Sequence, residues 1–476
     1  MKNFNSNLVW SILSQFSNYG LSLIFTIFLA RIVLPYEYGI VNQAQTITAF
    51  FIIFADGGIV WSIVREKMIK DDEVINLFWI NTALGILLFV LCWLSASYVS
   101  SFYNTPEVEN VLKSLGVIFI LTGLSTPFLM WLKREMEFKK ITVINIISTT
   151  IGGLLAILAA FYNYGYWSLV LLALAKAFVQ LLLLSLSAKM PIGLYKFKIP
   201  IRQMIKFGIG LIGFGIVNYF ARNLDNILIG KFGGAIELAL YAKAYFLMFL
   251  PSMLITGALS GLMVSVLAKV QDNPDKFQDI YAKVLRMIFV VTLPVTGYFL
   301  IFPEDPILLF YGHNWDGSIV LLQVLSIAAI TQPLYNTMGW IYTAIGKSKE
   351  MFHWGIVSSV ILSTSFVIGV QWGAVGVATT YSVVMGLFFV YFGLGKAHKL
   401  ANIHLKESFA PLLPIAIIGI ISLLMVKSLF SYITIENTYF KILLKVMILL
   451  CVYILFLYLK YKNNLLNIFM IERGLK

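Results

Sequence analysis

Charged side chains occur at only a few positions inside the long apolar stretches of this chain. The candidates among them are Arg31 (near the end of its stretch), Asp56, Lys176, Arg222, Asp225 and Lys243. A charge near the centre of a bilayer costs at least about 2.5–3.5 kcal/mol, so such a residue is a functional candidate by default. Cationic groups pair with phosphate or carboxylate groups, while buried carboxylates can bind a proton or Na⁺. The pattern therefore predicts an internal polar site that suits an anionic ligand.

One apolar stretch carries three of these candidates on a single helical face. Asn218, Arg222 and Asp225 recur at i, i+4 and i+7, which places them on one side of a helix. This face could line a water-filled cavity. Arg222 and Asp225 could also neutralise each other across one turn. The two interpretations are compatible, because a paired arginine can still line a cavity.

Polar residues also form stripes on the first two apolar stretches. Gln15 and Asn18 belong to a stripe with steps of three or four residues, and Asn42 and Asp56 lie near one face of the next stretch. Lipid rejects such stripes, whereas a cavity or a helix interface accepts them. We favour a cavity, with interhelical hydrogen bonds as the alternative. The predicted cavity residues are Arg31, Arg222, Asp225, Lys243, Asn218, Gln15, Asn18, Asn42 and Lys176.

Three of the cations have alternative interpretations. Arg31 and Lys243 could extend to the membrane interface, and Lys176 could face the cavity or pair with an acid. Asp56 and Asp225 are the carboxylates that could bind a proton or Na⁺ to drive transport, and the sequence does not choose between them.

Composition places all of these residues in a membrane protein. The chain has 476 residues, of which 60% are hydrophobic and 12% charged, and its mean hydropathy is +0.88. Such a chain is typical of an all-α polytopic membrane protein. No catalytic signature, metal-ligand spacing or cofactor motif stands out, so we expect neither an enzyme nor a cofactor. The PEDP sequence at 303–306 is predicted to form a turn in an outside loop.

Hydropathy predicts about fourteen membrane-spanning helices of roughly 20 residues each. Their limits are 8–33, 39–64, 75–100, 109–132, 141–162, 166–188, 205–230, 235–267, 285–303, 317–345, 352–370, 373–395, 409–429 and 440–460. Most of the 35 Lys and Arg residues fall in loops on the side of the N-terminus. The positive-inside rule therefore places both termini in the cytoplasm. The net charge of +13 is explained by this orientation and by contact with anionic lipids, so no nucleic-acid partner is expected.

The two halves of the chain resemble each other. LARIVLPYEYGIVNQA, from Leu29, matches IGKFGGAIELALYAKA, from Ile229, with Arg31 aligned on Lys231 and Glu37 on Glu237. A repeat of an even number of spans predicts two lobes related by an axis along the membrane normal, as in secondary transporters. The predicted lobes are residues 1–190 and 205–400, each with about six helices. A cytoplasmic linker at 191–204 joins them. Residues 401–476 carry an appended helix pair, 13 and 14, and a cytoplasmic tail.

Several short motifs resemble a known family when they are taken in order. They are LARIVLPYEYG, FADGGI, MEFKKI, GYWSLV, RNLDNILIGKFGG, YAKAY and GAVGVA. With the layout of six, six and two spans, the chain resembles the multidrug/oligosaccharidyl-lipid/polysaccharide (MOP) exporter superfamily. Within that superfamily it is most similar to the polysaccharide-exporter branch, which includes the O-antigen, colanic acid and teichuronic acid flippases. The resemblance covers nearly the whole chain.

This resemblance implies a flippase of the bacterial cytoplasmic (inner) membrane that serves cell-surface polysaccharide biosynthesis. Its implied substrate is an oligosaccharide repeat unit on undecaprenyl pyrophosphate, and its implied mechanism is alternating access by rocking of the lobes. By the same analogy Arg31, Arg222, Asp225 and Lys243 are the best cavity candidates. The implied partners are the lipid-linked glycan, membrane lipids, H⁺ or Na⁺, and a polymerase of the same pathway.

Two other functions compete with this interpretation. An ion-coupled drug or metabolite antiporter of the same superfamily would have a cavity dominated by acids, whereas here the intramembrane cations match or outnumber the acids. A membrane polysaccharide polymerase usually carries a long outside loop with Arg or His residues. The longest outside loop here, roughly 303–317, contains only His313 of these residue types.

Overall fold

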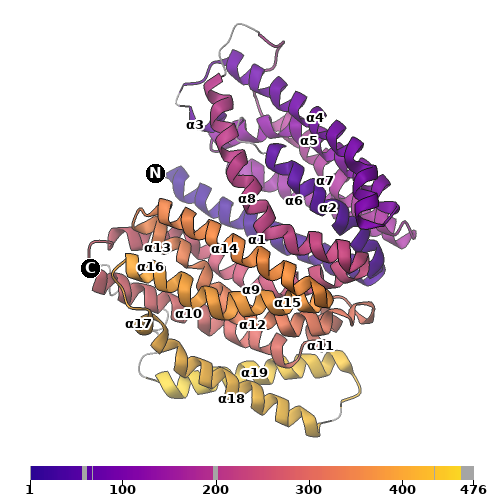
Figure 1. Ribbon diagram of the computed structural model, residues 1–476. Helices are drawn as coiled ribbons and strands as arrows, with labels where there is room; N and C mark the ends of the chain where they lie inside the picture. The colour runs from indigo at the N-terminus through magenta and orange to yellow at the C-terminus, as the bar shows by residue number, and fades with distance from the viewer. Residues whose placement is uncertain are drawn as a thin grey trace. The chain divides into compact units, whose positions relative to one another are not determined.

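The fold is helical throughout the described part of the chain. The computed structural model describes residues 2–55, 60, 62–66, 68–196, 202–433 and 435–462, and every regular element in these ranges is an α-, 3₁₀- or π-helix (Figure 1). This confirms the predicted all-α fold class. Eleven helical stretches of the described residues are long and apolar enough to cross a membrane. The chain is therefore a multi-pass membrane protein.

The predicted number of fourteen spans stays a prediction. One of the eleven stretches, Ser348–Leu400, contains two helices that turn back on each other at Gly373, where φ is +66°. The first helix of the chain contributes only a shorter apolar segment, Gly20–Ile32, to the described spans. Both features lower the number of stretches relative to the number of predicted spans.

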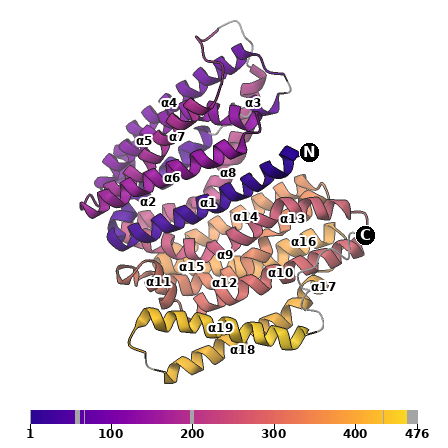
Figure 2. The ribbon, with the colours of Figure 1, turned by 180° about the vertical axis from the view of Figure 1, so that it is seen from behind.

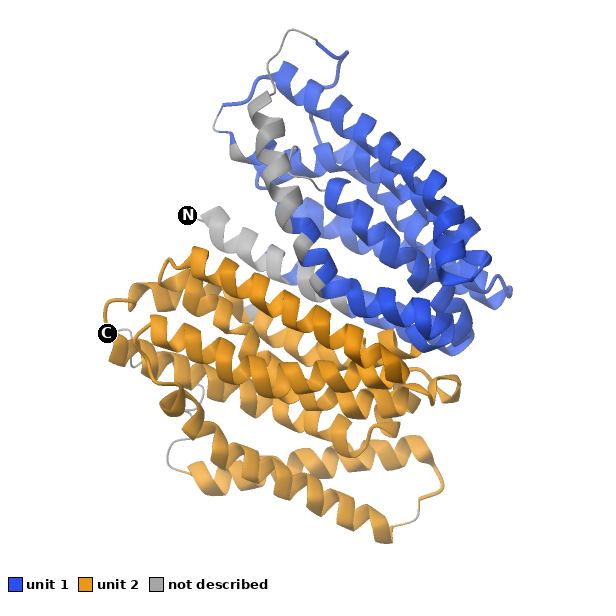
Figure 3. Ribbon diagram, viewed as in Figure 1, with its two compact units in different colours: residues 1–239 blue, residues 240–476 orange. Residues whose placement is uncertain are grey.

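The chain divides into two compact units, residues 1–239 and 240–476 (Figure 3). Unit 1 contains α1 (Lys2–Ile32), α2 (Pro35–Ala55), α3 (Ser62–Arg65), α4 (Asp71–Tyr103), α5 (Glu107–Arg134), α6 (Phe138–Phe161), α7 (Tyr166–Ser187), α8 (Arg202–Phe232) and the start of α9 (Gly234–Lys269). The repeat instead predicts that α8 opens the second lobe. Contacts of α8 with α2 explain its place in unit 1, and the repeat-based lobe boundaries stay a prediction.

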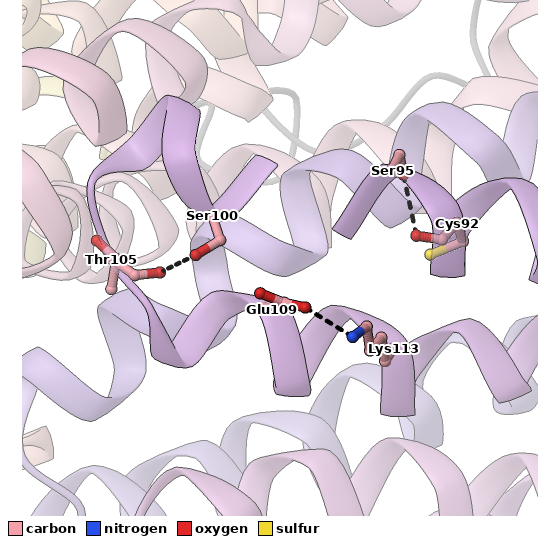
Figure 4. Close-up of polar contacts among 6 residues, drawn as sticks. All are labelled: Cys92, Ser95, Ser100, Thr105, Glu109 and Lys113. Carbon is pink, nitrogen blue, oxygen red and sulfur yellow. Dashed lines mark hydrogen bonds and ion pairs between the residues drawn. The ribbon is translucent and has the colours of Figure 1, made fainter. Parts of the chain in front are cut away.

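Close packing in unit 1 depends on small residues and tight turns. A Cβ atom added to Gly85 of α4 would lie 2.4 Å from the carbonyl oxygen of Phe119 on α5, so these two backbones approach closely. At the turn between α4 and α5, Ser100 Oγ donates to the Thr105 carbonyl oxygen over 3.0 Å (Figure 4). The short turn between α6 and α7 contains Gly165 with φ +52°, a conformation that favours glycine.

Unit 2 contains the remainder of α9 and the helices that follow it. They are α10 (Pro274–Ile301), α11 (Glu304–Phe310), η1 (His313–Trp315), α12 (Ser318–Asn336), α13 (Met338–Ala344), α14 (Ser348–Gly369), η2 (Val370–Trp372), α15 (Gly373–Val383), η3 (Val384–Gly393), α16 (Leu394–Leu400), α17 (Leu405–Phe409), η4 (Ala410–Leu412), α18 (Leu413–Tyr432) and α19 (Thr438–Tyr461). Helices α18 and α19 run side by side (Figure 2). They correspond to the predicted appended pair.

The turn predicted at 303–306 is wrong. Residues Glu304–Phe310 form helix α11. Proline is tolerated in the first turn of a helix, where the amide it lacks would have no intrahelical partner. Pro303 and Pro306 both lie at this end of α11, so the segment keeps its prolines and is still helical.

Candidate functional site

The polar face of α8 is only partly exposed. Asn218 and Arg222 are exposed, one turn apart, whereas Asp225 is buried with 4% of its surface exposed. The Asp225 Oδ1 atom accepts a hydrogen bond of 2.8 Å from the amide of Asn226. The two ends of the predicted face therefore differ: Asn218 and Arg222 are accessible, while Asp225 lies inside the helix packing.

Contacts with α2 fix this orientation of α8. The Gln43 side chain donates to the Gly230 carbonyl oxygen over 3.0 Å, and the Tyr219 hydroxyl donates to the Thr46 carbonyl oxygen over 2.6 Å. Phe50 meets the Tyr219 ring edge-to-face, with centroids 5.3 Å apart. Successive helical residues are about 100° apart. Turning Tyr219 toward α2 therefore directs its neighbour Asn218 to another side of the helix.

The candidates on α1 and α2 occupy different environments. Arg31 is exposed at the end of α1, while Asn18 and Asn42 are half-buried. The Asn42 carbonyl oxygen accepts a bond of 2.8 Å from the Thr46 hydroxyl. Asp56 and the side chain of Gln15 lie outside the described residues.

The repeat motif has structural roles at two helix ends of unit 1. The Glu37 carboxylate accepts a hydrogen bond of 3.0 Å from the Leu34 amide, so it caps the start of α2. Lys231, which aligns with Arg31 in the repeat, donates to the Phe102 carbonyl oxygen and lies 4.9 Å from the centroid of the Phe102 ring. The matched charges in the repeat therefore stabilise turns between helices.

Lys243 belongs to unit 2 and is enclosed by aromatic rings. It is 7% exposed, and its ammonium lies 5.4 Å from the ring centroid of Tyr311 and 5.5 Å from that of Trp315. Both rings are fully buried. Attraction between a cation and the ring face compensates part of the cost of burying the charge. This environment holds Lys243 in place on the side of α9 that faces the segment after α11.

Lys176 lies half-buried in the middle of α7. It faces α6 at Gly152, where an added Cβ atom would lie 3.1 Å from the Lys176 Cβ atom. The other polar side chains on this face are uncharged. Gln180 donates to the Asn145 side chain over 3.3 Å.

Unit 2 contains a buried ion pair that was not predicted from the sequence. Lys445 Nζ of α19 lies 2.7 Å from Asp305 Oδ2 of α11, and the Tyr298 hydroxyl donates to the same carboxylate over 2.5 Å. The available signal was an isolated lysine inside the last predicted span. Its partner is 140 residues away in sequence, so spacing alone could not identify the pair.

The described part of the chain contains no cluster of potential metal ligands. There, no group of three or more His, Cys, Asp or Glu side chains is arranged to hold an ion. An apolar cavity of about 470 Å³ does lie in unit 2, between α9, α10, α11 and α19. Tyr298 of the buried ion-pair cluster is one of its lining residues.

The sequence matches a family model described as "Polysaccharide biosynthesis protein" over residues 28–320, which is more than half of the chain. The chain belongs to this family. A similar relative is the lipopolysaccharide biosynthesis protein WzxC of Escherichia coli strain K12, at 25% identity over 80% of this chain and 78% of the relative. Another is the teichuronic acid biosynthesis protein TuaB of Bacillus subtilis strain 168, at 24% identity over 71% and 70% of the two chains. The predicted resemblance to polysaccharide exporters is confirmed.

Solved structures of the same fold belong to membrane transporters. The inward closed conformation of the lipid II flippase MurJ matches with a TM-score of 0.74 and 16% identity, over 96% of this chain and 99% of that one. An inward-facing MATE transporter of the MOP superfamily matches with a TM-score of 0.63 and 15% identity, over 81% and 96%. At these identities the likeness shows the fold alone, and it agrees with the predicted all-α fold class.

Proposed function

We propose that this protein is a flippase for undecaprenyl-pyrophosphate-linked oligosaccharide repeat units in the bacterial cytoplasmic membrane. Membership of a polysaccharide biosynthesis family supports the pathway. A likeness in fold to a lipid II flippase supports a lipid-linked substrate. The observation that carries the proposal is the exposed pair Asn218 and Arg222 in α8, because an exposed guanidinium within a membrane helix can bind a pyrophosphate through paired hydrogen bonds.

In this mechanism the two predicted lobes alternate in opening toward the cytoplasm and toward the outside. Arg222 binds the pyrophosphate, and the half-buried amides of Asn18 and Asn42 offer hydrogen bonds to the glycan. Arg31 adds positive charge at the end of α1. Asp225 or Asp56 binds the H⁺ or Na⁺ that drives the cycle. Both chain termini lie in the cytoplasm, and a polymerase of the same pathway receives the product.

The test is the Arg222→Ala variant, expressed in host cells that lack the chromosomal gene. We expect surface glycan to fall by about tenfold or more, because a hydrogen bond to a charged group contributes about 1.5–3 kcal/mol. Arg222→Lys cells should display an amount of surface glycan between that of the wild type and that of Arg222→Ala, since lysine keeps the charge but loses the paired hydrogen-bond geometry. Lys399→Ala removes an exposed cation at the end of α16 and serves as the control. Normal glycan in Arg222→Ala cells would remove this residue from the site.

A drug antiporter remains the second candidate, because a multidrug MATE transporter shares the fold. The two functions predict different phenotypes for cells in which the gene is deleted. A flippase defect leaves lipid-linked repeat units on the cytoplasmic face and no surface polymer. An antiporter defect leaves the surface polymer intact and increases drug sensitivity. Unpolymerised units on the outer face would instead indicate a polymerase.

A further inference from the structure

The middle of α7 carries a lysine that the mechanism above does not use. Lys176 is half-buried and sits where α6 and α7 touch, because Gly152 provides no side chain there. A Cβ atom at Gly152 would lie 2.9 Å from the Leu172 carbonyl oxygen and 3.1 Å from the Lys176 Cβ atom. The two helices thus hold the base of the Lys176 side chain between them.

The polar groups beside Lys176 are uncharged. Gln180 lies one turn further along α7 and donates to Asn145 of α6 over 3.3 Å. Thr149 lies one turn from Asn145 on the same face of α6, at the level of Lys176. Its hydroxyl is buried and has no hydrogen-bond partner in the part of the chain that the structure describes. An amine at this position would find both a donor and an acceptor in that hydroxyl.

The charged groups on the helices packed against α7 lie near the helix ends. These helices are α6, α5 and α2. Their titratable or cationic residues are Lys139 and Lys140 on α6; Glu107, Glu109, Lys113, Lys133 and Arg134 on α5; and Tyr36, Glu37 and Tyr38 on α2. On α7 itself, Tyr166 lies at the outer end and Lys189 just beyond the other end. Asp56, after α2, lies outside the described residues.

Glu37 illustrates the separation between these carboxylates and Lys176. Its carboxylate lies beside Gly165 at the start of α7. Gly165 is eleven residues before Lys176, a separation of about 16 Å along a helix. An ammonium that lacks a neighbouring carboxylate in a low-dielectric environment is costly. A lysine can remove that cost by releasing its proton, whereas an arginine cannot.

We propose that Lys176 is a proton-exchange site within unit 1. The ammonium gives one proton to water on one side of the membrane, which leaves a neutral amine and a hydronium ion. The amine then accepts a hydrogen bond from the Thr149 hydroxyl until it takes up a proton from the other side. The proposal rests on the proposed function, because it assigns this proton to the transport cycle. It adds a site to the carboxylates that the sequence offers for ion coupling.

The test compares three variants in host cells that lack the chromosomal gene. The rate at which surface glycan appears is measured with the transmembrane proton gradient intact and after nigericin has collapsed it. We expect collapse to slow the wild-type protein by about tenfold or more. Lys176→Gln keeps a slow rate that does not respond to the gradient. Lys176→Arg, with a permanent charge, abolishes transport. Lys189→Arg changes an exposed lysine and should respond as the wild type does.

The possible outcomes separate this proposal from the proposed function. A Lys176→Arg protein that transports and responds to the gradient like the wild type would overturn the proton-exchange site. So would a wild-type rate that does not respond to the gradient, because a proton would then take no part in the transport cycle. Surface glycan that appears normally without any form of the protein would instead contradict the flippase function. Equal amounts of each variant in the membrane exclude a failure to fold.

Discussion

At the level of single residues, the environments of the cations differ more than the sequence suggests. Arg222 is exposed on α8, and Lys231 is held at the end of α4 by a carbonyl oxygen and a ring. Lys243 is enclosed by Tyr311 and Trp315. The three side chains therefore differ in exposure and in contacts, so these cations are not interchangeable candidates for binding an anionic ligand.

Lys243 gives a prediction about aromatic support. Replacing Trp315 by Leu removes one of the two rings near the ammonium. We expect a loss of stability of about 3–5 kcal/mol, as for other large-to-small changes of buried aromatic residues, including about 2 kcal/mol from the cation–ring contact. Thermal unfolding of the purified protein in detergent measures the change. In a Lys243→Met background the same substitution should cost less, and equal costs in the two backgrounds would show that the ring does not support the ammonium.

A glycine in α2 provides a second prediction at this level. A Cβ atom on Gly39 would lie 2.0 Å from the Ala235 carbonyl oxygen, so Gly39→Ala forces these backbones apart. Overpacking of this kind typically costs about 1–3 kcal/mol, and we expect the melting temperature to fall. Gly20→Ala is the matched control, because no atom lies within 4 Å of its added Cβ. Equal melting temperatures for the two variants would contradict the close approach.

At the level of elements, a buried ion pair connects the appended helices to the rest of unit 2. Lys445 of α19 pairs with Asp305 of α11, and the side chains are 10% and 11% exposed. Tyr453 adds a hydrogen bond of 3.1 Å to the Val290 carbonyl oxygen of α10. On the other end of α10, Gln278 donates to Ser408 of α17 over 2.7 Å. Polar contacts thus supplement the apolar packing of α17 and α19 against α10 and α11.

The ion pair predicts a strong effect of removing one partner. Lys445→Met leaves the Asp305 carboxylate without its cation, and breaking a buried pair in this way costs about 3–5 kcal/mol. The double variant Lys445→Met with Asp305→Leu should recover much of that loss, because no charge remains buried. Resistance to proteolysis in membranes measures both. Lys396→Ala, which breaks an exposed contact of 3.9 Å with Glu350, should change stability by about 1 kcal/mol or less.

At the level of the whole molecule, the proposed orientation places both termini in the cytoplasm. Alkaline phosphatase, which is active only outside the cytoplasmic membrane, provides the test when it is fused at chosen positions. A fusion after His313 should be active, because this exposed residue follows a predicted outside segment. A fusion after Lys476 should be inactive. The reverse pattern would invert the topology and contradict the positive-inside assignment.

The sequence by itself determined the class of fold and the family. Long apolar stretches can cross a membrane only as helices or closed barrels, and their length here suits helices. The order of short motifs indicated a polysaccharide exporter, and the family match agrees with it. These conclusions depend on composition and local periodicity, which a single chain displays directly.

Only the tertiary structure decided which polar residues are exposed and which are paired. Asn218 and Asp225 share a helical face in sequence, yet one is exposed and the other is buried, because burial depends on the neighbouring helix. Asp305 and Lys445 meet across 140 residues, and Lys243 meets two rings from a later segment. Helical periodicity specifies a direction around one axis. The partner in that direction is set by how the helices pack, which no spacing within one helix can specify.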